Sequence, residues 1–159
     1  MAKIIVLYYS KTGNTEKMAQ AVKQGVENSD SEAELARVED FNPEDLSEYE
    51  GIIIGSPTYY GLLAGPVKDF LDRSIKVHGQ LENKAGAAFS SCATTGGGVE
   101  STILSILEAM LVHGMLVKGF SDRGHYGPIS VGEPDERALK ECRQLGEEMG
   151  NLVRNNYPG

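Results

Sequence analysis

The strongest constraint on the fold is a strand-like apolar run that ends directly in a polar turn. Residues Ile4–Tyr9 are apolar or aromatic, and the turn Ser10-Lys11-Thr12-Gly13-Asn14-Thr15 follows them at once. Apolar residues then recur at helical spacing, at Met18, Val22 and Val26. A short continuous apolar run is typical of a strand buried on both faces, as parallel sheets require. The chain therefore begins as a strand–turn–helix unit of an α/β fold.

The same alternation continues along the chain without internal repeats. We expect strands at Lys3–Tyr9, Glu32–Val38, Ile52–Gly55, Ala85–Ser90 and Met115–Phe120. Helices are predicted from Thr15, from Pro66, over Gly98–His113 and from Pro134, with a short helical turn at Pro43–Glu48. Five such units predict a doubly wound, five-stranded parallel sheet in the order 2-1-3-4-5, with three αβα layers in one domain over residues 1–159.

Composition narrows the classes of partner. The 159 residues are 40% hydrophobic and carry a formal charge of −8, which argues against nucleic acid and anionic membrane surfaces. No apolar stretch reaches the length of a membrane span, and we expect a cytoplasmic protein. Cys92 and Cys142 lie far apart, outside any C-x-x-C motif. Neither a metal site nor a disulfide is therefore expected.

The turn Ser10–Thr15 is suited to hold a phosphate group. It combines hydroxyl and amide side chains with a glycine, and its backbone N–H groups lie at the start of a helix, where the dipole favours an anion. The lysine of the G-x-x-x-x-G-K-[ST] motif is absent, so a phosphomonoester fits better than a triphosphate. An ordinary helix N-cap is the simpler interpretation of the turn alone.

Two further loops follow the third and fourth predicted strands, at the sheet edge where open α/β folds bind ligands. They are Ser56-Pro57-Thr58-Tyr59-Tyr60-Gly61 and Ser91-Cys92-Ala93-Thr94-Thr95-Gly96-Gly97-Gly98. Tyrosine rings can stack on a flat heteroaromatic ligand, and glycines let backbone amides approach its edge. Alternatively, the tyrosines pack on the Gly61–Gly65 loop and the glycines form a flexible turn. Together with the phosphate turn, the loops predict a flavin mononucleotide (FMN) site.

At these motifs the chain resembles the flavodoxin-like superfamily, and most of all the Trp-repressor-binding-protein (WrbA) type of FMN-dependent NAD(P)H:quinone oxidoreductase. The resemblance rests on Tyr8-Tyr9-Ser10, Gly55–Gly61, Thr95–Glu100 and His113-Gly114-Met115. It implies that FMN is the cofactor, NAD(P)H the co-substrate and a quinone-like molecule the acceptor. The cofactor-binding residues are then Ser10, Lys11, Thr12, Gly13, Asn14, Thr15, Pro57, Thr58, Tyr59, Tyr60, Gly61, Ser91, Cys92, Thr94, Thr95, Gly96 and Gly97.

The resemblance also implies two candidate catalytic residues that contact the flavin or stack on substrate. His113 matches a histidine that approaches the flavin across a subunit interface in those enzymes. Tyr59 stands where those relatives have an arginine. Longer members carry insertions that help to build a tetramer, whereas the segments Leu35–Gly51 and Gly124–Pro134 are short here. Both a homodimer and a homotetramer therefore remain open.

The alternative function is that of a flavodoxin, an electron carrier that serves a redox partner protein rather than a small-molecule acceptor. Such carriers usually close the flavin with an aromatic residue in an acidic loop after the fourth strand. Here that loop, Cys92–Gly98, has neither an aromatic nor an acidic residue. His125 and Tyr126 follow the fifth predicted strand, where they either line a substrate mouth or are simply solvated.

Overall fold

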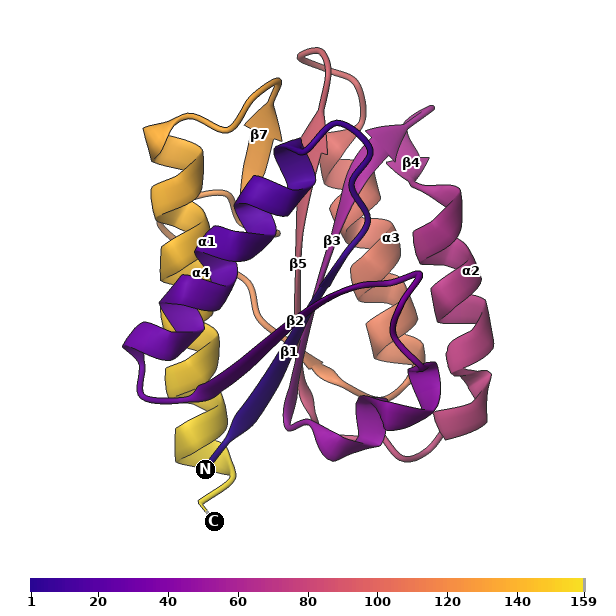
Figure 1. The fold of residues 1–159 in the computed structure, drawn as a ribbon, viewed down its shortest axis with the longest axis vertical. Coiled ribbons are helices and arrows are strands. Elements are labelled where there is room, and N and C mark those ends of the chain that lie inside the picture. The colour runs from indigo at the N-terminus through magenta and orange to yellow at the C-terminus, as the bar shows by residue number, and fades with distance from the viewer. Residues whose placement is uncertain (159) are drawn as a thin grey trace.

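A central twisted sheet lies between two pairs of helices in the computed structural model, which describes residues 1–158 (Figure 1). The main strands are β1 (Lys3–Tyr8), β2 (Glu32–Arg37), β3 (Gly51–Tyr59), β5 (Ala85–Cys92) and β6 (Leu116–Val117). They pair in parallel in the order β2-β1-β3-β5-β6. Because β4 is a short extra strand, this is the predicted order 2-1-3-4-5, and the doubly wound fold is confirmed.

The helices divide between the two faces of the sheet. In Figure 1, α1 (Asn14–Asn28) and α4 (Glu136–Asn156) cover one face, and α2 (Gly65–Arg73) and α3 (Val99–Val112) cover the other. Two short 3₁₀ helices, η1 (Pro43–Glu48) and η2 (Ser74–Val77), complete the second layer. The Asn42 side chain caps η1 by accepting a hydrogen bond from the Glu44 backbone N–H, which confirms the helical turn expected there.

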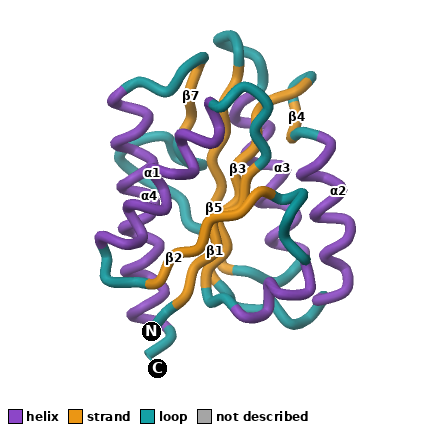
Figure 2. The backbone as a smooth tube through the Cα atoms, viewed as in Figure 1, coloured by secondary structure: helices purple, strands orange, loops and turns teal. Residues whose placement is uncertain are grey.

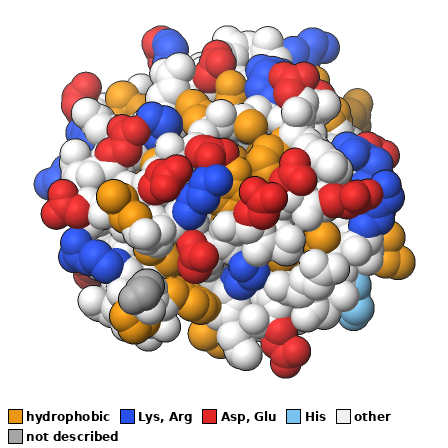
Figure 3. All heavy atoms as spheres, turned by 60° about the horizontal axis from the view of Figure 1, so that its bottom comes forward, with side chains coloured by type: hydrophobic (Ala, Val, Ile, Leu, Met, Phe, Trp, Pro, Cys, Tyr) orange, Lys and Arg blue, Asp and Glu red, His pale blue; other side chains and the backbone are white. Residues whose placement is uncertain are grey.

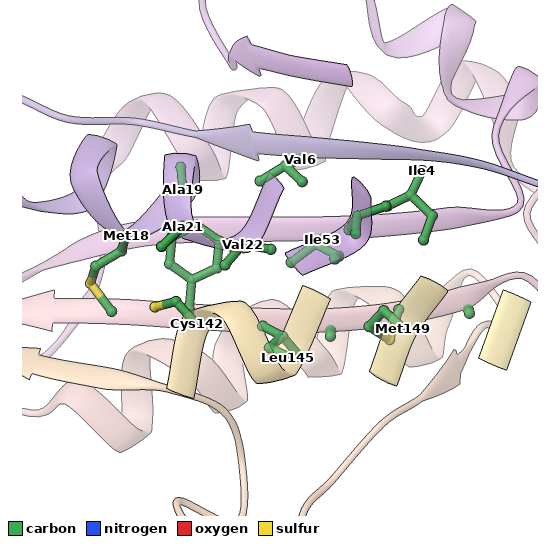
Figure 4. Close-up of a cluster of buried hydrophobic side chains, with 14 of the residues drawn as sticks. Ile4, Val6, Met18, Ala19, Ala21, Val22, Ile53, Cys142, Leu145 and Met149 are labelled. Carbon is green, nitrogen blue, oxygen red and sulfur yellow. The ribbon is translucent and has the colours of Figure 1, made fainter. Parts of the chain in front are cut away.

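Both faces of the sheet are buried, as the continuous apolar strands predict. In β1, Ile4 and Val6 pack toward α1 and α4, whereas Ile5 and Leu7 pack on the opposite side. Figure 4 shows the first of these clusters, in which side chains of α1 and α4 such as Met18, Val22, Leu145 and Met149 meet the sheet. The two cores fix the register of the strands, because a slip of one residue would exchange the faces.

The sheet departs from the prediction at its edges. The fifth strand, expected over Met115–Phe120, is interrupted: β6 pairs with the start of β5, and β7 (Ile129–Val131) pairs with its end. The intervening segment leaves the sheet after Val117, and Gly127 (φ +145°) passes so close to Ala88 that a Cβ atom would overlap the Ala88 carbonyl oxygen. In addition, β3 runs four residues beyond the expected Gly55 and pairs with antiparallel β4 (Leu62–Leu63).

The loops of the predicted site lie at one end of the molecule (Figure 2). The loops that follow β1, β3 and β5 gather at one end, at the top of Figure 2. Figure 3 looks toward the opposite end, where basic side chains lie singly or in small groups among acidic ones. Among residues 1–158, no helix is both long enough and apolar enough to cross a membrane.

Candidate functional site

The turn between β1 and α1 presents several backbone donors without partners. Gly13 adopts a left-handed conformation (φ +99°), and its N–H donates to Ser10 Oγ at 3.1 Å. Within the described residues, the N–H groups of Lys11, Thr12, Asn14, Thr15 and Glu16 find no acceptor in the protein. They lie at the N-terminus of a 15-residue helix, so a negatively charged group would satisfy them.

Two side chains connect this turn to neighbouring strands of the sheet. Thr15 Oγ1 is 2.9 Å from Ser91 Oγ, and both residues are buried, so the Thr15 hydroxyl ties α1 to the end of β5. Arg37, at the end of β2, donates from Nη2 to the Ser10 carbonyl oxygen at 2.7 Å. Its guanidinium group also lies over the rings of Tyr8 and Tyr9. Sequence reasoning missed Arg37; its place at the end of the strand beside β1 is the signal that could have found it.

A cavity of about 220 Å³ joins the three loops that the sequence analysis singled out. It is lined by Lys11, Thr12, Asn14, Thr15, Pro57, Thr58, Tyr59, Ser91, Cys92 and Ala93. The structure therefore brings the predicted phosphate turn and the starts of both predicted ring loops to one place. The volume is below the roughly 300 Å³ of typical small-molecule sites. A flavin ring would therefore extend beyond this cavity, toward the surface between the two ring loops.

The first ring loop is a tight hairpin between β3 and β4. Its two central residues, Tyr60 (φ +50°) and Gly61 (φ +81°), both have positive φ, as in a type I′ turn. The Tyr60 ring is fully exposed, while Tyr59 is 40% exposed and meets Tyr9 edge-to-face at 6.4 Å between ring centroids. Burial raises the pKa of Tyr59, so its hydroxyl is neutral at physiological pH. A left-handed tyrosine is unusual, and its exposed ring is free to stack on a ligand.

The second ring loop packs against the first. Gly98 (φ +102°) lies so close to the hairpin that a Cβ atom would be 2.6 Å from the Gly61 Cα atom. The Thr58 hydroxyl points into the protein, toward Ser90 and Thr102, so any contact of Thr58 with a ligand would come from its backbone. Cys92 is buried, its thiol donates to the Thr94 carbonyl oxygen at 3.3 Å, and burial raises its pKa. This thiol is therefore protonated and unreactive at neutral pH.

His113 does not join the other predicted site residues within one chain. It follows α3, whose other end carries the glycine loop, and its Nε2 atom is 2.8 Å from Ser74 Oγ. The pKa of His113 is lowered, mainly by burial and to a smaller extent by the neighbouring His78. His113 lines a cavity of about 730 Å³ between α2 and α3, which reaches Leu62 of β4. A role of His113 beside a flavin therefore requires a second copy of the chain.

His125 and Tyr126 lie in the segment between β6 and β7, partway along the sheet edge. With Leu104, Leu107 and Leu111 of α3 they line a separate cavity of about 270 Å³. They are thus not part of the cavity that joins the three loops. In the part of the chain that the structure describes, no three His, Cys, Asp or Glu side chains are grouped to hold a metal ion.

The chain is similar to known proteins both in sequence and in structure. Residues 5–110 match a sequence family described as a flavodoxin domain. A protein named flavodoxin from Aquifex aeolicus is 36% identical over 162 residues, covering 96% of this chain and 88% of that protein. One named NAD(P)H dehydrogenase (quinone) from Sinorhizobium fredii is 40% identical over 160 residues, covering 84% and 80%. The solved structure of a flavodoxin, WrbA-like protein from Agrobacterium tumefaciens has a TM-score of 0.84 at 26% identity, covering 98% and 99%.

Proposed function

We propose that this chain, which belongs to the flavodoxin family, binds FMN and passes two electrons from NAD(P)H to a quinone-like acceptor. The observation that carries the proposal is the set of unpartnered N–H groups at Lys11, Thr12 and Asn14–Glu16, beside a cavity shared by three loops. Such donors bind a phosphomonoester without a cationic side chain. FMN, the cofactor that membership of the flavodoxin family implies, combines a phosphomonoester with a flat ring.

Each loop has a distinct task in this proposal. The backbone of Lys11–Glu16 binds the phosphate. The Ser10 hydroxyl oxygen accepts from the Gly13 N–H, so the hydroxyl proton is available to donate to the phosphate as well. The hairpin residues Tyr59 and Tyr60 stack on the ring, and the backbone of Thr94–Gly97 meets its polar edge. When bound, the flavin supplies the redox chemistry by accepting hydride and returning electrons to the acceptor. The protein positions the ring and leaves part of it accessible.

An enzyme is favoured over a carrier by the composition of the second ring loop. The residues Ala93–Gly98 carry no aromatic or acidic side chain that could cover the outer face of the ring. A nicotinamide or a quinone could therefore stack there in turn. His113 would reach the flavin from a second copy of the chain in a homodimer or homotetramer. This arrangement places the apolar cavity between α2 and α3 near the contact between copies.

The second candidate function is that of an electron carrier for a redox partner protein. It is favoured by the flavodoxin from Aquifex aeolicus, which matches 96% of this chain over a similar length. In this case the exposed Tyr60 at the hairpin tip would contact the partner protein rather than a small substrate.

The test is to load the purified protein with FMN and to follow the flavin absorbance anaerobically after adding NADH or NADPH. We expect rapid bleaching that a benzoquinone reverses over repeated cycles. Flavin that stays yellow with both nucleotides but bleaches with dithionite would assign the chain to the carriers. Failure to bind FMN at all would overturn both candidates.

A further inference from the structure

The end of β5 ties the loops of the site to both helical layers. Neighbouring residues of a strand point to opposite faces of the sheet. Ser91 accordingly meets Thr15 of α1, under the phosphate turn. Ser90 points to the other face and meets Thr58 of β3, with 3.1 Å between the two hydroxyl oxygens. The ring loops thus have a hydroxyl contact of their own, separate from that of the phosphate turn.

This second contact continues into α3 through Thr102. Thr102 Oγ1 donates to Thr58 Oγ1 at 3.0 Å, and Ser90 Oγ donates to the Ser56 carbonyl oxygen at 2.8 Å. Each hydroxyl has a single proton, so Thr58 uses its own proton toward Ser90 when it accepts from Thr102. Thr102 and Ser90 are fully buried. The result is a directed chain of hydrogen bonds from α3 through β3 to β5.

Thr102 also holds the second ring loop. Its Oγ1 atom and its backbone N–H are each 3.0 Å from the Gly98 carbonyl oxygen. Gly98 is the residue that packs on Gly61 at the turn of the hairpin. One buried threonine therefore bonds to both loops that carry the predicted ring contacts: its hydroxyl proton goes to Thr58, and its backbone N–H donates to the Gly98 carbonyl oxygen.

We propose that Thr102 is a positioning residue for the flavin ring. Its hydroxyl ties the hairpin Thr58–Gly61 to the first turn of α3, whose backbone holds the loop Thr94–Gly98 at Gly98, so that the ring meets both loops in one geometry. Thr102 acts through Thr58 and Gly98, and it makes no contact with the cofactor. The inference rests on the proposed FMN binding. It assigns to the ring loops a role that can be separated from that of the phosphate turn.

The experiment compares three variants by titration with FMN and with riboflavin, which lacks the phosphate. Thr102→Val removes the hydroxyl and keeps the shape of the side chain, whereas Thr102→Ser keeps the hydroxyl. Ser101→Ala is the matched control, because Ser101 Oγ also donates to the Gly98 carbonyl oxygen, at 3.3 Å, but is exposed and does not reach Thr58. The dissociation constants of the folded proteins are measured by quenching of flavin fluorescence.

We expect Thr102→Val to weaken the binding of both flavins by roughly fivefold, the value of one hydrogen bond of about 1 kcal/mol. The ratio of FMN to riboflavin affinity stays constant because the phosphate turn is unchanged. Thr102→Ser and Ser101→Ala bind within about twofold of the wild type. A purely structural role would lower the unfolding temperature without changing the affinity of the folded protein. It would therefore not give this result.

Three results would overturn the inference while FMN binding stands: wild-type affinity in Thr102→Val, no rescue by Thr102→Ser, or a loss for FMN alone. If Thr102→Val does not fold, Thr58→Val removes the other hydroxyl of the same bond, and the same expectations apply. A wild-type protein that binds neither flavin would overturn the proposed function, and this inference with it.

Discussion

At the scale of a single residue, Gly13 determines the backbone conformation of the phosphate turn. Its φ of +99° is left-handed, and a Cβ atom there would have no protein atom within 4 Å. The space beside it is therefore open, next to the unpartnered N–H groups of the turn. A side chain at this position would strain the backbone and, in the proposed site, would occupy open space beside the N–H groups that bind the phosphate.

We therefore predict that Gly13→Val weakens FMN binding by about tenfold, because the free variant relaxes from a turn strained by roughly 1–2 kcal/mol and must return to that turn to bind the phosphate. Riboflavin binding should change much less, because riboflavin lacks the phosphate. The control is Gly79→Val, since Gly79 has a similar φ of +86°, also has open space around it, and lies in the loop after η2. Equal FMN affinity in the two variants, measured by fluorescence titration, would remove the phosphate assignment from this turn.

At the scale of elements, local patterns predicted the parts that depend on local physics. The continuous apolar run of β1 and the polar turn after it indicated a doubly buried strand and the start of α1, and the structure has both. The hairpin was missed because Pro57 disfavours a strand and Tyr60 has no preference for left-handed turns. The interrupted fifth strand depends on pairing with β5, which a local pattern does not contain.

The candidate site divides in the same way. The loops were predictable because parallel strands deliver their carboxyl ends to one edge of the sheet. The residues that support these loops were not, because their contacts are distant in sequence. Thr102 lies 44 positions from Thr58, and Arg37 lies 27 positions from Ser10. A buried threonine in a helix has no signal that distinguishes it from an ordinary core residue.

The packing of α1 on α4 gives a prediction at this scale. The two helices meet through Gly25 and Gly146, and a Cβ atom on Gly146 would overlap the Val22 carbonyl oxygen. We predict that Gly146→Ala lowers the free energy of unfolding by about 3 kcal/mol, because backbone cannot move aside as a side chain can. Gly65→Ala in α2 is the control, since its added Cβ meets no atom within 4 Å, and it should change stability by less than about 0.5 kcal/mol. Urea unfolding curves of the two apoproteins measure the difference, and similar midpoints would show that the helices can separate without cost.

At the scale of the whole molecule, net charge opposes the proposed cofactor. The chain carries a formal charge of −8, and the phosphate of FMN brings further negative charge. The proposed phosphate site uses neutral N–H groups, and the nearby Arg37 is paired with Glu39 at 3.1 Å. In the proposed complex, local donors therefore have to overcome a long-range repulsion between the protein and FMN.

This balance predicts that added salt tightens FMN binding. Raising potassium chloride from about 20 to 300 mM shortens the Debye length from roughly 20 Å to about 6 Å, which screens the distant acidic groups more than the donors in contact. We expect the affinity for FMN to rise by about two- to threefold, while that for uncharged riboflavin changes little. A phosphate held by lysine or arginine would behave in the opposite way, because salt weakens ion pairs. The affinity is measured by the same fluorescence titration. If it falls with added salt, the phosphate is held by a cationic side chain such as Lys11 rather than by the neutral donors.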